Sequence, residues 1–152
     1  MSQEPATGDE CFGALDKLRA AVIVTLAHGG QAWQETILFT AMLSNLGGKE
    51  LYLKVLRERD PRAIASPAFR NVLLAYKRLQ TYVDPRSPGR NWNDATAMVI
   101  AGRAGMQVMG DWAKGEFMAA GQAAGRHFGC IAGLGLASPY LIQGDVFVFP
   151  KT

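Results

Sequence analysis

The amino-acid sequence predicts an α/β fold that is rich in helix and contains few, short strands. Two observations carry this prediction. Short runs of β-branched and apolar residues alternate with longer segments in which apolar residues recur at helical spacing. Residues 31–101 form a helix-heavy insertion, because no strand-like run interrupts them. The length of 152 residues and the 49% share of hydrophobic residues fit one domain with a core of ordinary size.

The first two elements are expected to be a helix over residues 9–21 and a buried strand over residues 22–26. Asp9 stands at the start of the helical spacing and is the candidate N-cap. The strand sequence, VIVTL, is short and rich in β-branched residues, as a buried strand should be.

Three helices are expected in the insertion. One begins at residue 32 and stops at Gly47-Gly48, because glycine adopts the conformation that ends helices. An amphipathic helix covers residues 49–59 and is ended by Asp60-Pro61. The third opens at Ser66-Pro67, with Ser66 as the N-cap and proline at the first helical position.

The second half of the chain is expected to hold two more helices and two more strands. Residues 84–89 form a loop, because two prolines and a glycine forbid regular structure. Helices are expected over residues 93–101 and 112–120, and strands over residues 106–109 and 146–149.

Charge and hydropathy argue against several classes of partner. The net charge is only +3 and no five like charges follow one another, so no nucleic-acid or membrane partner is indicated. No segment reaches the ~18–20 apolar residues that span a bilayer. The polar N-terminus lacks a signal-peptide pattern, which by itself favours a cytoplasmic protein. The sequence leaves open whether Cys11 and Cys130 pair or remain separate thiols.

Three motifs suggest chemistry, and each lacks a necessary part. His28-Gly29-Gly30 resembles the oxyanion-hole loop of lipases and esterases, but the chain has no Gly-x-Ser-x-Gly nucleophile elbow. Residues 133–138 begin like a dinucleotide-binding loop, but the third glycine is missing and Pro139 interrupts the next helix. His28 and His127 lack metal-ligand spacing. Neither an enzyme nor a cofactor or metal site is therefore expected.

Two tryptophans on loops are the candidates for a binding site. Trp92 lies in the loop GRNWND directly before a helix, and Trp112 follows Gly110-Asp111 at a strand-to-helix turn. Open α/β sheets bind ligands at the carboxyl ends of their strands, which is where this turn lies. An indole face packs well on the C–H face of a pyranose ring. The residues by themselves fit a sugar site and an ordinary core role about equally.

Four blocks of sequence narrow this choice. They are LAHGGQAWQ at residues 26–34, SPAFRNVLLAYKRLQTYVDP at 66–85, GRNWNDATAMVIAGRAGMQVMGDWAKGEF at 89–117 and DVFVFPK at 145–151. In this order they resemble the periplasmic glucose/mannose-binding proteins, which are the solute receptors of carbohydrate ABC transporters. The resemblance extends from about residue 12 to residue 151.

The resemblance implies a two-lobed receptor that closes on one sugar and delivers it to a membrane permease, with no bond made or broken. It implies that Trp92 and Trp112 stack on a monosaccharide such as glucose and that Asp145 binds the sugar hydroxyls. Gln143 stands where the family often has an asparagine. Trp33 is expected to be structural.

The same resemblance implies that residues 1–152 are a single partial domain, the second-lobe region, without the first lobe and the C-terminal helices. It implies a periplasmic location, although the N-terminus has no signal-peptide pattern. Half a cleft leaves one face of the sugar in water, so weak binding is expected. Exposed edges of such a lobe favour self-association. The alternative is a stand-alone α/β interaction module without a transport role, which does not need Trp92, Trp112 and Asp145 to face one cleft.

Overall fold

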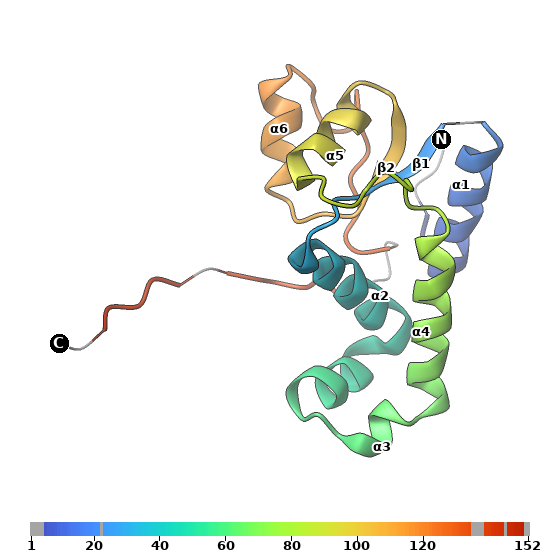
Figure 1. Ribbon diagram of the computed structural model, residues 1–152, viewed down its shortest axis with the longest axis vertical. Helices are drawn as coiled ribbons and strands as arrows, with labels where there is room; N and C mark the ends of the chain where they lie inside the picture. Colours follow the sequence, from blue (N-terminus) through green and yellow to red (C-terminus); the bar gives the residue numbers. More distant parts are fainter. Residues whose placement is uncertain (1–4, 22, 135–138, 145, 151–152) are drawn as a thin grey trace.

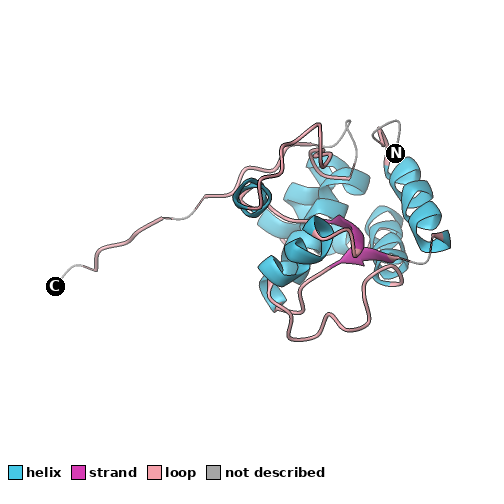
Figure 2. Cartoon of the chain, turned by 90° about the horizontal axis from the view of Figure 1, so that it is seen from above, coloured by secondary structure: helices cyan, strands magenta, loops and turns pink. Residues whose placement is uncertain are grey.

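Two short parallel strands lie among helices in the computed structural model (Figures 1 and 2). Strand β1, Val24–Ala27, pairs with strand β2, Ala104–Gln107, and Leu26 lies opposite Met106. Leu26 also forms a parallel bridge with Val83 on a separate segment. The structure describes residues 5–21, 23–134, 139–144 and 146–150. The helix-rich α/β class that the sequence predicts is therefore confirmed.

Helix α1, Gly8–Ala20, precedes β1 and is close to its expected bounds, but its cap differs. The Thr7 hydroxyl accepts a hydrogen bond from Glu10 N at 3.2 Å, so Thr7 is the N-cap. Asp9, the expected cap, lies inside the first turn, where its negative charge faces the positive end of the helix dipole.

Helix α2, Ala32–Tyr52, covers the two segments that were expected on either side of Gly47-Gly48. Gly48 has φ 70° and ψ 176°, so the backbone breaks there as predicted, but the helix resumes after the kink. A π-helical turn, Leu53–Arg57, continues it, and a short helix α3, Pro61–Ile64, begins after the capping residue Asp60. The expected end of one helix at Gly47-Gly48 and the start of another are therefore confirmed, and α2 covers both helical segments across the kink.

Helix α4, Pro67–Gln80, confirms the expected start at Ser66-Pro67. The Ser66 hydroxyl accepts a hydrogen bond from Phe69 N at 3.2 Å, and proline occupies the first helical position. The helix packs against α2, as the contacts between the two elements show. On this helix Val72 and Leu79 are buried, whereas Leu73 is 44% exposed.

The second half contains helices α5, Trp92–Ile100, and α6, Ala113–Ala119, on either side of β2. Strand β2 begins two residues earlier than the sequence predicted. The prediction of a strand over residues 146–149 is wrong, because these residues form neither helix nor strand. These four side chains are 81–93% exposed, and Figure 1 shows this segment projecting away from the helices. A strand forms only where a neighbour supplies backbone partners, and no described residue pairs with the segment.

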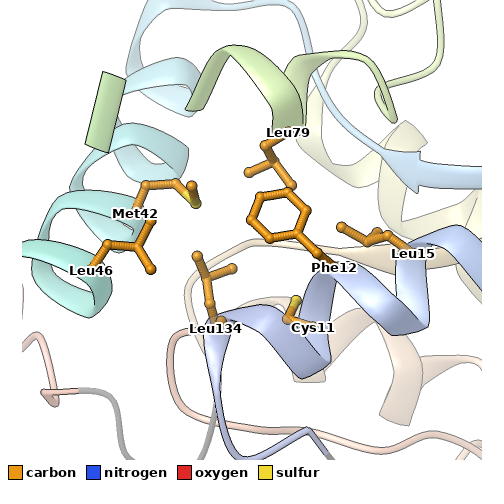
Figure 3. A pocket seen from close by; sticks show the side chains of 8 residues that line it. Cys11, Phe12, Leu15, Met42, Leu46, Leu79 and Leu134 are labelled. Carbon is orange, nitrogen blue, oxygen red and sulfur yellow. The ribbon is translucent and has the colours of Figure 1, made fainter. Parts of the chain in front are cut away.

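The largest apolar cluster joins α1, β1, α2 and α4. Its buried members are Cys11, Phe12, Leu15, Leu26, Leu38, Met42, Leu79, Tyr82 and Leu134. A cavity of about 10 Å³, no larger than one water requires, lies within this cluster. Figure 3 shows side chains that line it. The thiol of Cys11 lines it, and burial raises the pKa of that thiol. Cys11 is buried, Cys130 is exposed and both are free thiols, which answers the question left open by the sequence.

Two further findings concern only the described residues. None of their helices is both long and apolar enough to span a bilayer. Within the same residues, no group of three or more His, Cys, Asp or Glu side chains is arranged to hold a metal ion.

Candidate functional site

All three tryptophans stand at helix starts near the carboxyl edge of the sheet. Trp33 is the second residue of α2, which follows β1, and Trp112 is the N-cap of α6, which follows β2. Trp92 is the first residue of α5. Helices α2 and α6 are the next helices after β1 and β2, and the start of α5 contacts Gln107 at the end of β2. These helix starts therefore lie where open α/β sheets bind ligands.

A buried polar contact ties the start of α5 to the end of β2. The Gln107 side-chain amide donates a hydrogen bond to the Trp92 carbonyl oxygen at 3.0 Å. The hydroxyl of Thr96, which is fully buried, lies 3.0 Å from the same carbonyl oxygen and 2.8 Å from Gln107 Oε1. The backbone of Trp92 is therefore fixed, while its ring is half-buried.

The ring of Trp112 lies over Gly110. A Cβ atom added at Gly110 would be 2.2 Å from the ring, which is far inside van der Waals contact. Trp112 is 44% exposed, so one part of the indole packs on the glycine backbone and another part faces solvent. A large ring with an exposed face, held against a turn, can stack on a ligand.

A chain of side-chain amides joins the start of α2 to the start of α5. Gln31 Nε2 donates to Asn91 Oδ1 at 3.1 Å. Gln31 Oε1 accepts from the Trp33 indole Nε1 and from Gln34 Nε2, both at 2.9 Å. Trp33 was expected to be structural, yet its side chain is 41% exposed. Sequence reasoning missed Gln31, although its place between Gly-Gly and a helix start was the available signal.

The loop over residues 84–91 is fastened beside the loop that follows β1. The guanidinium of Arg90 contacts the carboxylate of Asp84 and donates to the His28 carbonyl oxygen at 3.2 Å. Gly30 N donates to the Arg90 carbonyl oxygen at 3.0 Å. Burial acts to raise the pKa of the Asp84 carboxyl, but hydrogen bonds from Arg86 N and Arg90 outweigh it and hold the pKa below its ordinary range.

Behind this edge, His28 faces a carboxylate on α2. Its Nε2 lies 3.1 Å from Glu35 Oε1, and the imidazole is buried. Glu35 Oε2 accepts hydrogen bonds from Tyr76 OH at 2.5 Å and Gln80 Nε2 at 3.0 Å. No described hydroxyl or thiol hydrogen-bonds to His28 Nε2. The hydrolase interpretation of the His28 loop is therefore not supported.

The pKa values of this pair follow from their contacts. Partial burial acts to raise the pKa of Glu35, but the hydrogen bond from Tyr76, the imidazole of His28 and the amide of Gln80 lower it below its ordinary value. Burial, followed by the hydrogen bond to the Glu35 carboxylate, raises the pKa of Tyr76 to about 12.

Tyr76→Phe is expected to lower the free energy of unfolding by about 1 kcal/mol, because a phenol–carboxylate hydrogen bond between α4 and α2 is lost. The lowered pKa of Glu35 stabilises the fold above its unfolded-state pKa, and this stabilisation is lost as pH falls through the folded value. The variant should thus lose less stability on acidification. Urea unfolding at several pH values measures both effects. Tyr52→Phe, outside this network, is the control, and equal losses in the two variants would contradict the assignment.

The structure places the four expected site residues in different ways. Trp92 and Trp112 stand at the same edge of the sheet. Gln107 of β2 hydrogen-bonds to the Trp92 carbonyl oxygen, and Trp112 begins the helix that follows β2. Gln143 is exposed on residues 139–144, which form neither helix nor strand. Asp145 lies outside the described residues. An open groove of about 440 Å³ lies elsewhere, toward the C-terminal end of α6, and is lined in part by Met118 and Phe128.

Comparison with known proteins gives three findings. Residues 1–140 match the family of bacterial extracellular solute-binding proteins. A probable sugar-binding periplasmic protein of Brucella suis biovar 1 (strain 1330) is 40% identical over 149 residues, which are 98% of this chain and 35% of that protein. An uncharacterised ABC transporter extracellular-binding protein of Pyrococcus horikoshii is 31% identical over 148 residues, 95% of this chain and 32% of that protein.

The fold is similar to that of a solved structure, a chitin oligosaccharide binding protein. The TM-score is 0.64 at 26% sequence identity, over 74% of this chain and 29% of that one. The chain spans about a third of the length of the curated relatives it matches.

Proposed function

Because the chain belongs to the family of bacterial extracellular solute-binding proteins, we propose that it is part of the sugar-binding component of an ABC transporter. The family consists of solute-binding proteins and not of enzymes. The proposed ligand is a monosaccharide of the glucose/mannose class, and the proposed partner is a transporter permease. The proposed location is the periplasm, as in the name of the Brucella relative.

One observation supports the sugar site most strongly, which is the placement of Trp92 and Trp112 at helix starts on one edge of a parallel sheet. Their rings would stack on the pyranose, and the nearby amides would exchange hydrogen bonds with its hydroxyls. Gln143 and Asp145 complete the proposed site by resemblance to the family. In this proposal residues 1–152 are a partial domain, the second-lobe region of a receptor, and the other lobe covers the far face of the sugar.

The chain by itself should bind glucose weakly. With one face of the site open, a dissociation constant in the millimolar range is expected, because the hydrogen bonds to the sugar compete with water. Trp112→Ala should weaken binding about tenfold, since an aromatic stacking face is lost. The change in indole ¹⁵N–¹H NMR shifts during a glucose titration measures both values.

Leu56→Ala is the matched control, because Leu56 is 40% exposed on the π-helical turn and belongs to no proposed contact. It should leave the dissociation constant unchanged. A micromolar or tighter dissociation constant would contradict the proposal that the chain holds only half of the site. If glucose shifts the indole signal of neither Trp92 nor Trp112, the proposed sugar site is wrong.

The alternative, an interaction module without a transport role, is favoured by exposed apolar side chains. Leu73 and Leu74 are 44% and 52% exposed on α4, and residues 146–149 are 81–93% exposed. Such surfaces also support the proposal of self-association. Sedimentation of the chain across a concentration series tests self-association, and glucose-dependent indole shifts decide between receptor and module.

A further inference from the structure

We propose that Trp33 and Gln31 form a second sugar subsite beside Trp92, so that the chain binds linked pyranose rings and not only one. This inference rests on the proposed sugar-binding function. It concerns a part of the edge to which the family resemblance assigned no ligand contact.

The exposure of Trp33 argues against a core role. The indole side chain is 41% exposed, although tryptophan is highly buried on average. Trp33 belongs to none of the three apolar clusters of the described residues, whereas Leu38 and Met42 of the same helix are fully buried in one of them. The ring therefore contributes little to the core of the described fold and leaves an apolar face available.

A hydrogen bond to a side chain at the same helix start orients the ring. The Trp33 indole Nε1 donates to Gln31 Oε1 at 2.9 Å. Gln31 is itself held at both ends of its amide, by Gln34 Nε2 on one side and Asn91 Oδ1 on the other. Gln34 is fully buried, which anchors the chain of amides to the interior. A ring that is exposed and already ordered loses little conformational entropy when a ligand stacks on it.

The position of the amides links this ring to Trp92. A single side-chain amide, that of Gln31, contacts both the Trp33 indole and Asn91, the residue before Trp92. Amide groups that donate and accept hydrogen bonds thus connect the Trp33 indole with the residue that precedes Trp92. Sugar hydroxyls require hydrogen-bonding groups beside the aromatic ring on which the sugar stacks. The Trp33 ring, beyond the amides, therefore suits a second pyranose of the same oligosaccharide.

Indole NMR with two probes, D-glucose and cellotriose, tests this inference on the chain with ¹⁵N-labelled tryptophan. Each of the three tryptophans contributes one indole N–H signal. Cellotriose is expected to shift the Trp33 signal more strongly than glucose does. Trp33→Ala is expected to weaken cellotriose binding about fivefold more than it weakens glucose binding.

Two further variants guard against a folding defect. Gln31→Ala keeps the ring but removes the hydrogen bonds of the Gln31 amide to Trp33, Gln34 and Asn91. About a twofold selective loss of cellotriose affinity is expected. Met118→Ala, at a 71% exposed site on α6, is the control and should change neither affinity.

Each outcome separates the subsite from the proposed function. If both sugars shift Trp92 and Trp112 but neither shifts Trp33, the second subsite is wrong while the sugar site stands. If cellotriose shifts Trp33 and glucose shifts no tryptophan, the subsite stands and the proposed monosaccharide site is wrong. If no indole signal shifts with either sugar, both are wrong.

Discussion

Arg90→Ala is expected to lower the free energy of unfolding by about 3–5 kcal/mol, because it removes the closer of the two counter-charges of a buried carboxylate. The side chain of Asp84 is 2% exposed and that of Arg90 is 13% exposed. The substitution also removes the hydrogen bonds of the guanidinium to the carbonyl oxygens of His28 and Arg86. The loop over residues 84–91 would lose its strongest side-chain attachment to the loop after β1.

Urea unfolding at pH 7 followed by circular dichroism measures this loss. Arg86→Ala is the matched control, because the Arg86 side chain is 82% exposed and its Nε lies 3.8 Å from Asp84 Oδ1. An exposed ion pair of this kind contributes about 0–1 kcal/mol, and the backbone N–H that binds Asp84 remains in the variant. Losses of equal size in the two variants would show that Arg90 has no special role.

The same ion pair has a pH signature. The pKa of Asp84 is lower in the folded chain than its ordinary value of 3.8. The ion pair therefore stabilises the fold above that ordinary pKa, and this stabilisation is lost as pH falls through the folded value. Without Arg90 the pKa of Asp84 is lowered less. The difference in free energy of unfolding between wild type and Arg90→Ala should therefore narrow below pH 4. A difference that stays constant with pH would contradict the charge-based account.

Gly30→Ala is expected to lower the free energy of unfolding by about 1–3 kcal/mol through overpacking. A Cβ atom at this position would lie 2.5 Å from the Ser87 carbonyl oxygen and 2.6 Å from Gly89 N and Pro88 Cα. These are backbone atoms, so no side-chain rotation relieves the contact. The loop over residues 84–91 must move away, and the hydrogen bond from Gly30 N to the Arg90 carbonyl oxygen is weakened with it.

Gly13→Ala is the control for this substitution. Gly13 lies inside α1, and a Cβ atom there meets nothing within 4 Å. Alanine in a helix interior should stabilise the chain by about 0.5–1 kcal/mol. The two variants add the same methyl group, so opposite signs in urea unfolding isolate the steric effect. Stabilisation by Gly30→Ala would mean that the two loops do not approach closely.

Displacing this loop should also disturb the candidate site. The loop leads directly into Asn91 and Trp92, and Asn91 accepts the hydrogen bond that orients Gln31. The indole signal of Trp33 should therefore shift in Gly30→Ala as well. This connects the packing of two loops to the geometry of the proposed sugar platforms.

The amino-acid sequence by itself determined the elements that depend on neighbours a few residues away. The start of α4 at Ser66-Pro67 follows from one hydroxyl and one ring-locked φ angle, and both act within a single turn. The break at Gly48 follows from the left-handed backbone that glycine adopts easily. The family resemblance was likewise readable, because it depends on the order of residues and not on their contacts.

Only the tertiary structure decided which elements meet. Residues 146–149 have strand-forming side chains but pair with no described strand, because pairing is a property of the neighbour as well. The contacts of Arg90 with Asp84, and of Gln31 with Asn91, gather loops that are distant in sequence. Such polar contacts leave no periodic pattern in the sequence, so the proposal of a second platform at Trp33 required the fold.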